Sequence, residues 1–239
     1  MKKLYLLFAL LLSISIVSCS DDDDEKAGNK KDLGGGIYLI NDHRFVDLGL
    51  PSGLLWAETN IGAKTAADDG SYFAWGETDM VTKAYYHWTT YKYGTSYDSL
   101  NKYNSTDGKR VLDKEDDAAY VNWGSSCRMP TITEFTELIS SENCTWTWTS
   151  MTTSDNSSID GYKVTSVKNG NSIFLPASGC RYSWDSLSHG SDGHYWSSTL
   201  SSADDYCDDA YYLSFDSADR DCVNLARRYG YSIRPVAEP

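Results

Sequence analysis

The chain has 239 residues and a formal net charge of −13, from 34 acidic side chains against 21 lysines and arginines. This acidic balance argues against a nucleic-acid-binding protein, because phosphate recognition needs a basic surface. The roughly 200 residues that follow the N-terminal segment are enough to build one sizeable hydrophobic core.

Residues 1–18 predict a secretory signal peptide. Lys2 and Lys3 precede an apolar run that is shorter than the roughly 20 residues a membrane helix needs. The run ends at Ile16-Val17-Ser18-Cys19, which resembles a bacterial lipobox. The resemblance implies that Cys19 is lipidated and becomes the mature N-terminus. Loss of the two lysines would change the formal net charge from −13 to −15.

Residues 19–36 are expected to form an acidic disordered tether. The run from Ser20 to Glu25 contains no apolar residue, and a run of like charges does not collapse. An acidic run just after a lipidated cysteine also resembles the surface-export signal of Bacteroidetes lipoproteins. This implies a lipid-anchored protein on the outer face of the outer membrane, where the anchor is the only contact with the membrane.

Residues 37–239 are expected to form a single domain that begins with short strands. Apolar runs at residues 45–48 and 54–56 flank the turn Pro51-Ser52-Gly53. Residues 79–112 are rich in Tyr, Thr, Ser, Asn and Lys and show little periodicity, so a long excursion of loops is expected there.

Two helices are predicted in the middle of the chain. Residues 114–123 open with acidic side chains and indicate a short helix. Residues 131–143 give a stronger signal, because Thr131 and Glu134 form a capping box. One apolar helical face then follows, made of Ile132, Phe135, Leu138 and Ile139.

After residue 143 the pattern changes to the period of β-strands. Trp146 and Trp148 alternate with threonines, and residues 162–167 run into Asn169-Gly170, a strong hairpin turn. Short strands, two helices and long loops in one domain predict an α+β fold.

The last third of the chain is expected to contain further strands, with a turn at residues 217–219. Alternation predicts that Tyr211, Leu213 and Phe215 point inward while Tyr212 and Ser214 point outward. Trp196 and Ile233 are assigned to the core.

No metal ion or other cofactor is expected. Cys207 lies among aspartates, but thiolates and clustered carboxylates suit different metals. His189, Asp192 and His194 on a glycine-rich loop are a better ligand cluster, yet their spacing matches no established site.

The cysteines are expected to be mostly free thiols. Once Cys19 is lipidated five remain, which is an odd number. A turn at residues 217–219 would place Cys222 opposite a residue near 213 and not opposite Cys207. Cys127 and Cys144 bracket a helix about 20 Å long, so this pair is also disfavoured.

The sequence gives little support for catalysis. It contains no G-x-S-x-G elbow, no phosphate-binding glycine loop and no dinucleotide fingerprint. Acidic pairs are so numerous that none of them is informative. The chain is therefore interpreted as a protein that is not an enzyme.

Several segments in order resemble the Fibrobacter succinogenes major paralogous domain family, which is common in Bacteroidetes lipoproteins. The N-terminal part of the resemblance is Val46–Gly53 and Ala74–Glu77. The remainder consists of Trp123-Gly124, Arg128–Thr131, Gly161–Thr165, Asn171–Ala177, Tyr195–Ser198 and Gly230–Val236. Many relatives have a large aromatic residue where this chain has Cys127, and a large residue is also expected at Cys180.

The resemblance implies a C-type-lectin-like fold, distantly similar to formylglycine-generating enzymes and to the variable proteins of diversity-generating retroelements. In that fold a small twisted antiparallel sheet and two helices support long loops. The C-terminal strands and their loops form the exposed ligand face.

Residues 182–231 contain no Lys, Glu or Met. Retroelement diversification of AAC-type codons produces Asn, Asp, Tyr, Ser, Cys, Ala, Arg, Gly and His but never those three residues, so the composition is compatible with it. A binding surface that merely favours Tyr, Ser and Asp would have a similar composition. The sequence leaves both explanations open.

The leading hypothesis is a surface-anchored protein that binds a protein or glycan ligand through loops at about residues 180–230. The alternatives are an oxidase related to formylglycine-generating enzymes, using Cys207 and Cys222, and a structural subunit of a fimbria-like surface assembly. The aromatic residues would supply contact area, and the charged and polar residues would select the partner. The candidate ligand-binding residues are Tyr182, Trp184, Asp185, His189, Asp192, His194, Asp204, Asp205, Tyr206, Asp208, Asp209, Tyr212, Asp219, Arg220, Asp221, Asn224, Arg227, Arg228 and Tyr229.

Overall fold

The structure is a computed structural model that describes residues 29–80, 82–182, 185–201 and 207–239. The expected signal peptide, Cys19 and most of the expected tether lie outside these residues. Among the helices that the structure describes, none is both long and apolar enough to cross a membrane.

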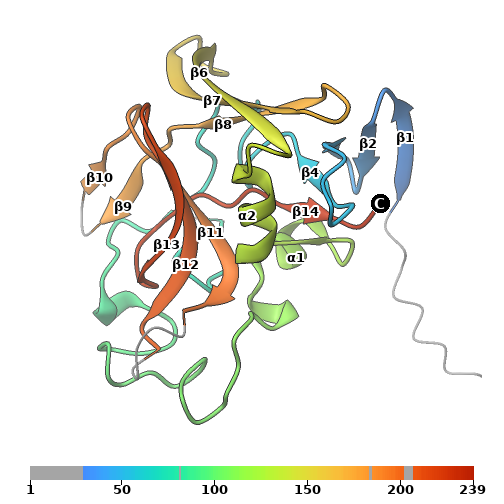
Figure 1. Cartoon of the computed structure of the whole chain (residues 1–239). Helices are drawn as coiled ribbons and strands as arrows, with labels where there is room; N and C mark the ends of the chain where they lie inside the picture. Colours follow the sequence, from blue (N-terminus) through green and yellow to red (C-terminus); the bar gives the residue numbers. More distant parts are fainter. Residues whose placement is uncertain (1–28, 81, 183–184, 202–206) are drawn as a thin grey trace, which may run out of the picture.

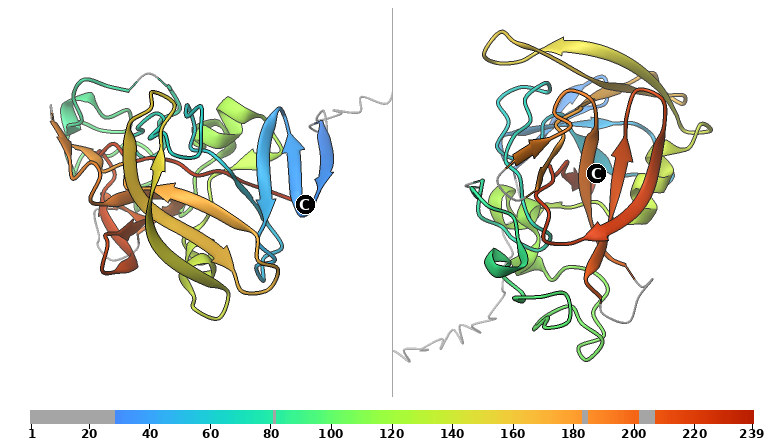
Figure 2. Two further views of the ribbon diagram at one scale, coloured as in Figure 1. Left: turned by 90° about the horizontal axis from the view of Figure 1, so that it is seen from above. Right: turned by 90° about the vertical axis from the view of Figure 1, so that its left-hand side faces the viewer.

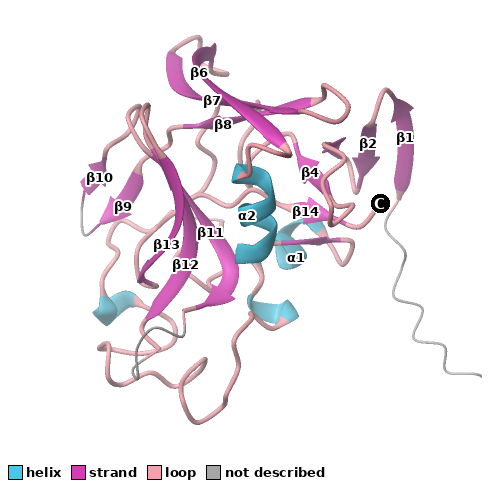
Figure 3. Ribbon diagram, viewed as in Figure 1, coloured by secondary structure: helices cyan, strands magenta, loops and turns pink. Residues whose placement is uncertain are grey.

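The predicted α+β class is confirmed. The described residues form antiparallel sheets together with two α-helices (Figures 1 and 3). A six-stranded sheet joins the N-terminal strands to the last strand of the chain (Figure 1). Its order is β1 (Lys30–Gly34), β2 (Ile37–Ile40), β3 (His43–Asp47), β4 (Leu55–Ala57), β14 (Val236–Ala237) and β5 (Cys127–Arg128).

The folded part begins earlier than expected. Strand β1 pairs with β2 although it lies inside the segment 19–36 that was assigned to the tether. All five of its residues are exposed, so backbone hydrogen bonds and not buried side chains hold the strand. Sequence patterns predict strands from apolar side chains that become buried, so they do not predict a strand whose side chains are all exposed.

The two predicted helices are present but shorter than their sequence patterns. The first divides into the 3-10 turn η2 (Lys114–Asp116) and α1 (Ala118–Trp123), because the Asp117 side chain accepts the backbone N–H groups of Ala119 and Tyr120 and starts a new helix there. The second is α2 (Ile132–Ile139), and its predicted Thr131–Glu134 capping box is confirmed. A further 3-10 turn, η1 (Trp88–Thr90), lies in the predicted loop region.

A three-stranded meander follows α2. It consists of β6 (Cys144–Thr152), β7 (Ser158–Ser166) and β8 (Ser172–Pro176), and the predicted hairpin at Asn169-Gly170 joins the last two. Trp146 and Trp148 pack edge-to-face against Tyr162. Figure 2 shows this meander as an outer layer at one side of the molecule.

The C-terminal sheet contains β11 (Gly193–Leu200), β12 (Asp209–Phe215) and β13 (Arg220–Ala226), beside a short hairpin of β9 (Cys180–Tyr182) and β10 (Asp185–Leu187). The turn predicted at residues 217–219 is confirmed, and Cys222 pairs with Leu213.

The alternation predicted for residues 211–215 is correct at Leu213 and Phe215 but wrong at both tyrosines. Tyr212 is buried and Tyr211 is only partly buried. Both faces of the sheet are covered: Leu213 belongs to one core cluster, whereas Tyr212 packs with Trp196 in the other. The core assignments of Trp196 and Ile233 are confirmed.

Residues 227–237 run between these sheets and the N-terminal half. Tyr231 exchanges backbone hydrogen bonds with Phe73, and Ser232 accepts one from Trp196. Arg234 is fully buried; its Nε donates to Asn60 Oδ1 at 2.8 Å and its Nη1 to the carbonyls of residues 57 and 58. A single charged side chain thus fastens the end of the chain to the loop after β4.

We predict that Arg234→Met lowers the free energy of unfolding by about 3 kcal/mol, because buried acceptors lose their charged donor. Arg44→Met is the matched control: it removes an exposed ion pair with Glu58 and should cost under about 1 kcal/mol. Urea unfolding followed by tryptophan fluorescence gives both values. Equal losses in the two variants would contradict the role of Arg234.

Stability should also fall at high pH. Burial raises the pKa of Tyr72, Tyr86 and Tyr91 above the ordinary value near 10. Below about pH 10 both states keep these protons, whereas above it only the unfolded state releases them, so stability declines as pH rises. Urea unfolding at increasing pH tests this, with tyrosinate absorbance as the second readout. Tyrosinate that appears before unfolding would contradict it.

Candidate functional site

Three predicted ligand-binding residues lie together at the end of β9 and just after β13. The guanidinium carbon of Arg228 lies 4.3 Å from the ring centroid of Tyr229 and 5.1 Å from that of Tyr182. The two tyrosine rings are 5.0 Å apart. The Trp88 ring lies 5.9 Å from the same guanidinium carbon. We call these four residues the aromatic–arginine patch.

Backbone hydrogen bonds position this patch. Arg181 and Gly230 exchange bonds of 2.8 and 3.0 Å, which brings Tyr182 and Tyr229 side by side. On the other side, His87 caps η1 and holds Trp88 in place. The patch therefore sits on three well-separated parts of the chain that are joined by main-chain contacts.

The charge of Arg228 is directed at ring faces. Its Nη2 lies 3.2 Å from Tyr229 Oη, whereas Nε and Nη1 are buried and have no hydrogen-bond partner among the described residues. No described carboxylate forms an ion pair with it. Burial raises the pKa of Tyr229, so the phenol stays protonated at neutral pH. With Tyr182 40% exposed, the patch presents a stacked cation–aromatic surface to solvent.

Trp88 was missed by the sequence analysis. It lies in the segment 79–112, whose sequence shows little hydrophobic periodicity. It joins the patch through a contact with Arg228, which is far away in the sequence. The only available signal was a tryptophan in a tyrosine-rich loop. Four predicted residues, Trp184, Asp204, Asp205 and Tyr206, lie outside the described residues, and of Asp185 the structure describes only the backbone in β10.

Three predicted ligand-binding residues are not on the exposed face. Arg227 is fully buried and donates to the carbonyls of residues 102 and 103. Tyr212 is buried, and the His194 ring packs against Tyr212 and Tyr231, where burial lowers its pKa. The structure places these residues within the fold, because the C-terminal sheet is packed on both faces.

The predicted polar residues divide between separate places. Asn224 donates to Asp209 at 2.9 Å, and the carbonyl of Asp208 accepts from the backbone of Arg227, so these residues help to shape the end of β13. A pocket of about 240 Å³ at the β12–β13 turn gathers four others, Asp192, Asp219, Arg220 and Asp221.

His189 lies in a different, polar pocket of about 390 Å³. Its Nε2 is 2.8 Å from Oδ2 of Asp69, a partner that the sequence analysis did not identify. Burial raises the pKa of Asp69, which the charge of His189 opposes. Asp68 accepts the backbone N–H of Ser154, so the pocket joins the loop after β4 to the β6–β7 turn.

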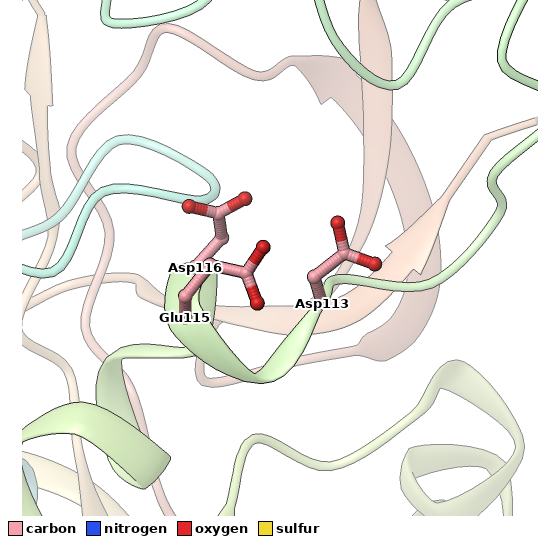
Figure 4. Close-up of side chains that lie close together, drawn as sticks. All are labelled: Asp113, Glu115 and Asp116. Atoms are coloured by element: carbon pink, nitrogen blue, oxygen red, sulfur yellow. The ribbon is translucent and has the colours of Figure 1, made fainter.

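Asp113, Glu115 and Asp116 form an acidic cluster that the sequence analysis did not identify (Figure 4). The ammonium group of Lys102 lies 2.7, 3.3 and 2.5 Å from their carboxylates, and Lys92 lies 2.9 Å from Asp116. The hydrogen bonds from lysines and tyrosines hold the pKa of buried Asp116 far below its usual range despite its desolvation. The cluster is accordingly an ion-pair network around the buried carboxylate of Asp116.

The five described cysteines are all thiols, as predicted. Cys222 faces Thr136 of α2, whereas Cys207 lies beside Arg110 at the other end of the sheet. The cysteine pair that an oxidase of the formylglycine-generating type would use is therefore not brought together. Burial raises the pKa of the Cys222 thiol to about 11.

Comparison with known proteins adds one match. A family model described as a domain of unknown function (DUF8237) matches residues 152–236, from the last residue of β6 to the first of β14. This range includes Tyr182, Arg228 and Tyr229 but not Trp88. No curated protein and no solved structure matches the chain significantly.

We predict that Lys102→Met lowers the free energy of unfolding by about 3 kcal/mol at neutral pH, because it leaves buried Asp116 short of counter-charge. Lys109→Met, which removes a more exposed lysine bonded to Asp113, is the matched control and should cost under about 1 kcal/mol.

The loss in Lys102→Met should shrink in acid. The folded pKa of Asp116 is depressed, so its contribution is present above the ordinary carboxyl pKa and is lost as pH falls below it. Urea unfolding of wild type and variant from neutral to acidic pH measures this. A gap that does not change with pH would rule out the ion-pair origin.

Proposed function

We propose that this chain is a lipid-anchored cell-surface protein that binds a protein or glycan ligand through the aromatic–arginine patch. The observation that carries the proposal is the stack of half-buried Arg228 on Tyr182, Tyr229 and Trp88, of which Tyr182 is exposed, with no described carboxylate to neutralise the arginine.

The chemistry of the patch supports recognition. Trp, Tyr and Arg dominate the energetics of protein interfaces, because rigid rings and a planar cation give large contact area at little conformational cost. The same ring faces can stack on the apolar faces of sugars. Since main-chain bonds hold the patch residues, little ordering would be needed on binding.

The cellular setting of the proposal comes from the N-terminal sequence. The lipobox-like ending at Cys19 and the acidic run after it support anchoring on the outer face of the outer membrane. The tether would hold the folded domain away from the lipid surface, which leaves the patch accessible to extracellular ligands. No metal or cofactor is required.

The finer fold assignment belongs to the same proposal. Two helices, a three-stranded C-terminal sheet and long loops, in the order of the quoted motifs, support a C-type-lectin-like domain of the Fibrobacter succinogenes major paralogous domain type. In such a domain the patch would fall on the ligand face.

Sequence diversification remains part of the proposal only for exposed positions. Tyr182, Arg228 and Tyr229 lie within the segment that lacks Lys, Glu and Met, but buried Arg227 and Tyr212 lie in it too. The encoding DNA tests this directly. Diversification requires a near-identical repeat that differs only at adenines, beside a reverse transcriptase gene.

The binding function is tested by screening residues 30–239 against arrays of glycans and surface proteins, followed by two arginine variants. Arg228→Ala should weaken binding of any recovered ligand by at least about tenfold, equivalent to about 1.4 kcal/mol. Arg220→Ala removes an arginine from the separate pocket at the β12–β13 turn and should change binding less than about threefold.

Unfolding curves of both variants exclude a folding defect. Binding that survives Arg228→Ala but fails with Arg220→Ala would move the site to the β12–β13 turn. A screen that recovers no ligand would contradict the binding function.

A further inference from the structure

The exposed edges of the sheets differ in how they are protected. Proteins commonly place charges on edge strands, because an unprotected edge can pair with another chain. The edge strand β1 carries two lysines and an aspartate, and β13 carries Arg220 and Asp221. Strand β6 forms the edge of its sheet over nine residues and contains no charged residue at all.

Strand β6 also lacks the irregularities that discourage pairing. Its register with β7 is continuous from Cys144 opposite Ser166 to Thr152 opposite Ser158, with no bulge. It contains no proline, and eight of its nine residues are threonine, tryptophan, serine or cysteine, the ninth being Met151. Nine residues at about 3.4 Å each present an edge roughly 30 Å long.

The hydrogen-bond pattern shows which backbone groups of β6 face outward. At its two ends Val167 donates to the carbonyl of Asn143, and Thr153 donates to that of Ser157. With the register of β6 on β7, this places the backbone groups of residues 145, 147, 149 and 151 toward β7. The N–H and C=O groups of Trp146, Trp148 and Ser150 therefore point away from the sheet, and they have no backbone partner within the described residues.

The side chains along this edge suit a second strand. Thr145, Thr147 and Thr149 are exposed on one face. On the other face, Trp146 and Trp148 pack on Phe215 but remain only partly buried. An added strand would pair with the outward backbone groups and cover the remaining surface of both tryptophans. Cross-strand threonine pairs are themselves favourable.

We propose that β6 is a self-association edge, on which β6 of a second copy pairs antiparallel about a twofold axis. The result is one continuous sheet in the order β8-β7-β6-β6-β7-β8. Because a twofold interface places the same patch on both partners, one uncharged strand supplies a complementary partner for itself. A heterologous partner would be selected by charges, and β6 offers none.

Electrostatics predicts how this association responds to salt. The net negative charge of the chain opposes contact between two copies, whereas β6 itself adds no like-charge contact. Added salt screens the long-range repulsion and should strengthen the dimer. The contact is small, with an interface at the low end of specific complexes, so a dissociation constant on the order of 10 µM is expected.

Analytical ultracentrifugation of residues 30–239 in reductant, over a wide concentration range, tests the proposal. The wild type should form dimers that strengthen with salt. The double substitution Thr147→Lys and Thr149→Lys should raise the dissociation constant of the dimer at least about tenfold, because like charges then face each other across the two paired β6 strands. Thr106→Lys, the same change at an exposed loop threonine, should leave the dimer unchanged.

Ser150→Pro is the second variant, because it removes an outward N–H and leaves the β6–β7 ladder intact. It should also yield monomers. A wild type that stays monomeric at every concentration would overturn the proposal. A dimer of unchanged affinity in the double-lysine variant would also overturn it. Both substitutions are at exposed positions, so that variant should fold normally and an unchanged affinity would mean that β6 is not in the interface.

Discussion

Two buried arginines at the end of the chain hold the molecule together. Arg227 and Arg234 are both fully buried, and the donors that find partners bond to main-chain carbonyls and to Asn60. Burial lowers the pKa of Arg234 to about 10, so it remains charged at neutral pH. A buried cation is costly unless its hydrogen bonds are made, so the loops that supply these carbonyls are confined to one arrangement.

The same constraint positions the candidate site. Arg228 and Tyr229 follow Arg227 directly, and the next residues pair with Phe73, with β11 and with β4. Two of the four residues of the aromatic–arginine patch, Arg228 and Tyr229, therefore lie at the start of a segment that main-chain hydrogen bonds hold in place. Functional groups on such a segment are held in place before a ligand arrives, which favours selective binding over adaptable binding.

Although the chain is acidic, its carboxylates do not form the candidate site, because many of them are already engaged within the protein. The acidic side chains near residues 113–116 are neutralised by lysines, and those at the β12–β13 turn largely accept backbone N–H groups. Arg228 is one of several cations that lie over aromatic rings, and no described carboxylate forms an ion pair with it.

Local chemistry was predictable from the sequence, whereas long-range packing was not. The Thr131 capping box, the Asn169-Gly170 hairpin and the pairing of Cys222 with Leu213 follow from neighbouring residues, and the structure confirms each. Alternation failed at Tyr212, because the pattern assumes that one face of a strand is exposed. Trp88 joins the site through tertiary contacts alone.

Of the patch residues, Tyr182, Arg228 and Tyr229 are predicted from the sequence, but only as part of a broad face of nineteen residues. Residue types that favour binding occur in cores as well, so composition could not separate half-buried Arg228 from fully buried Arg227, its neighbour. That distinction depends on which loop carbonyls lie within reach, and these come from residues 102 and 103.

The central claim is that ligand contacts the aromatic–arginine patch. The most direct measurement is NMR chemical-shift mapping of isotope-labelled residues 30–239 during titration with a ligand from the array screen. The account predicts that the Trp88 indole signal and the backbone amides of Tyr182, Arg228 and Tyr229 show the largest shifts. Shifts centred on the His189–Asp69 pocket or the β12–β13 turn, with the patch signals unmoved, would contradict it.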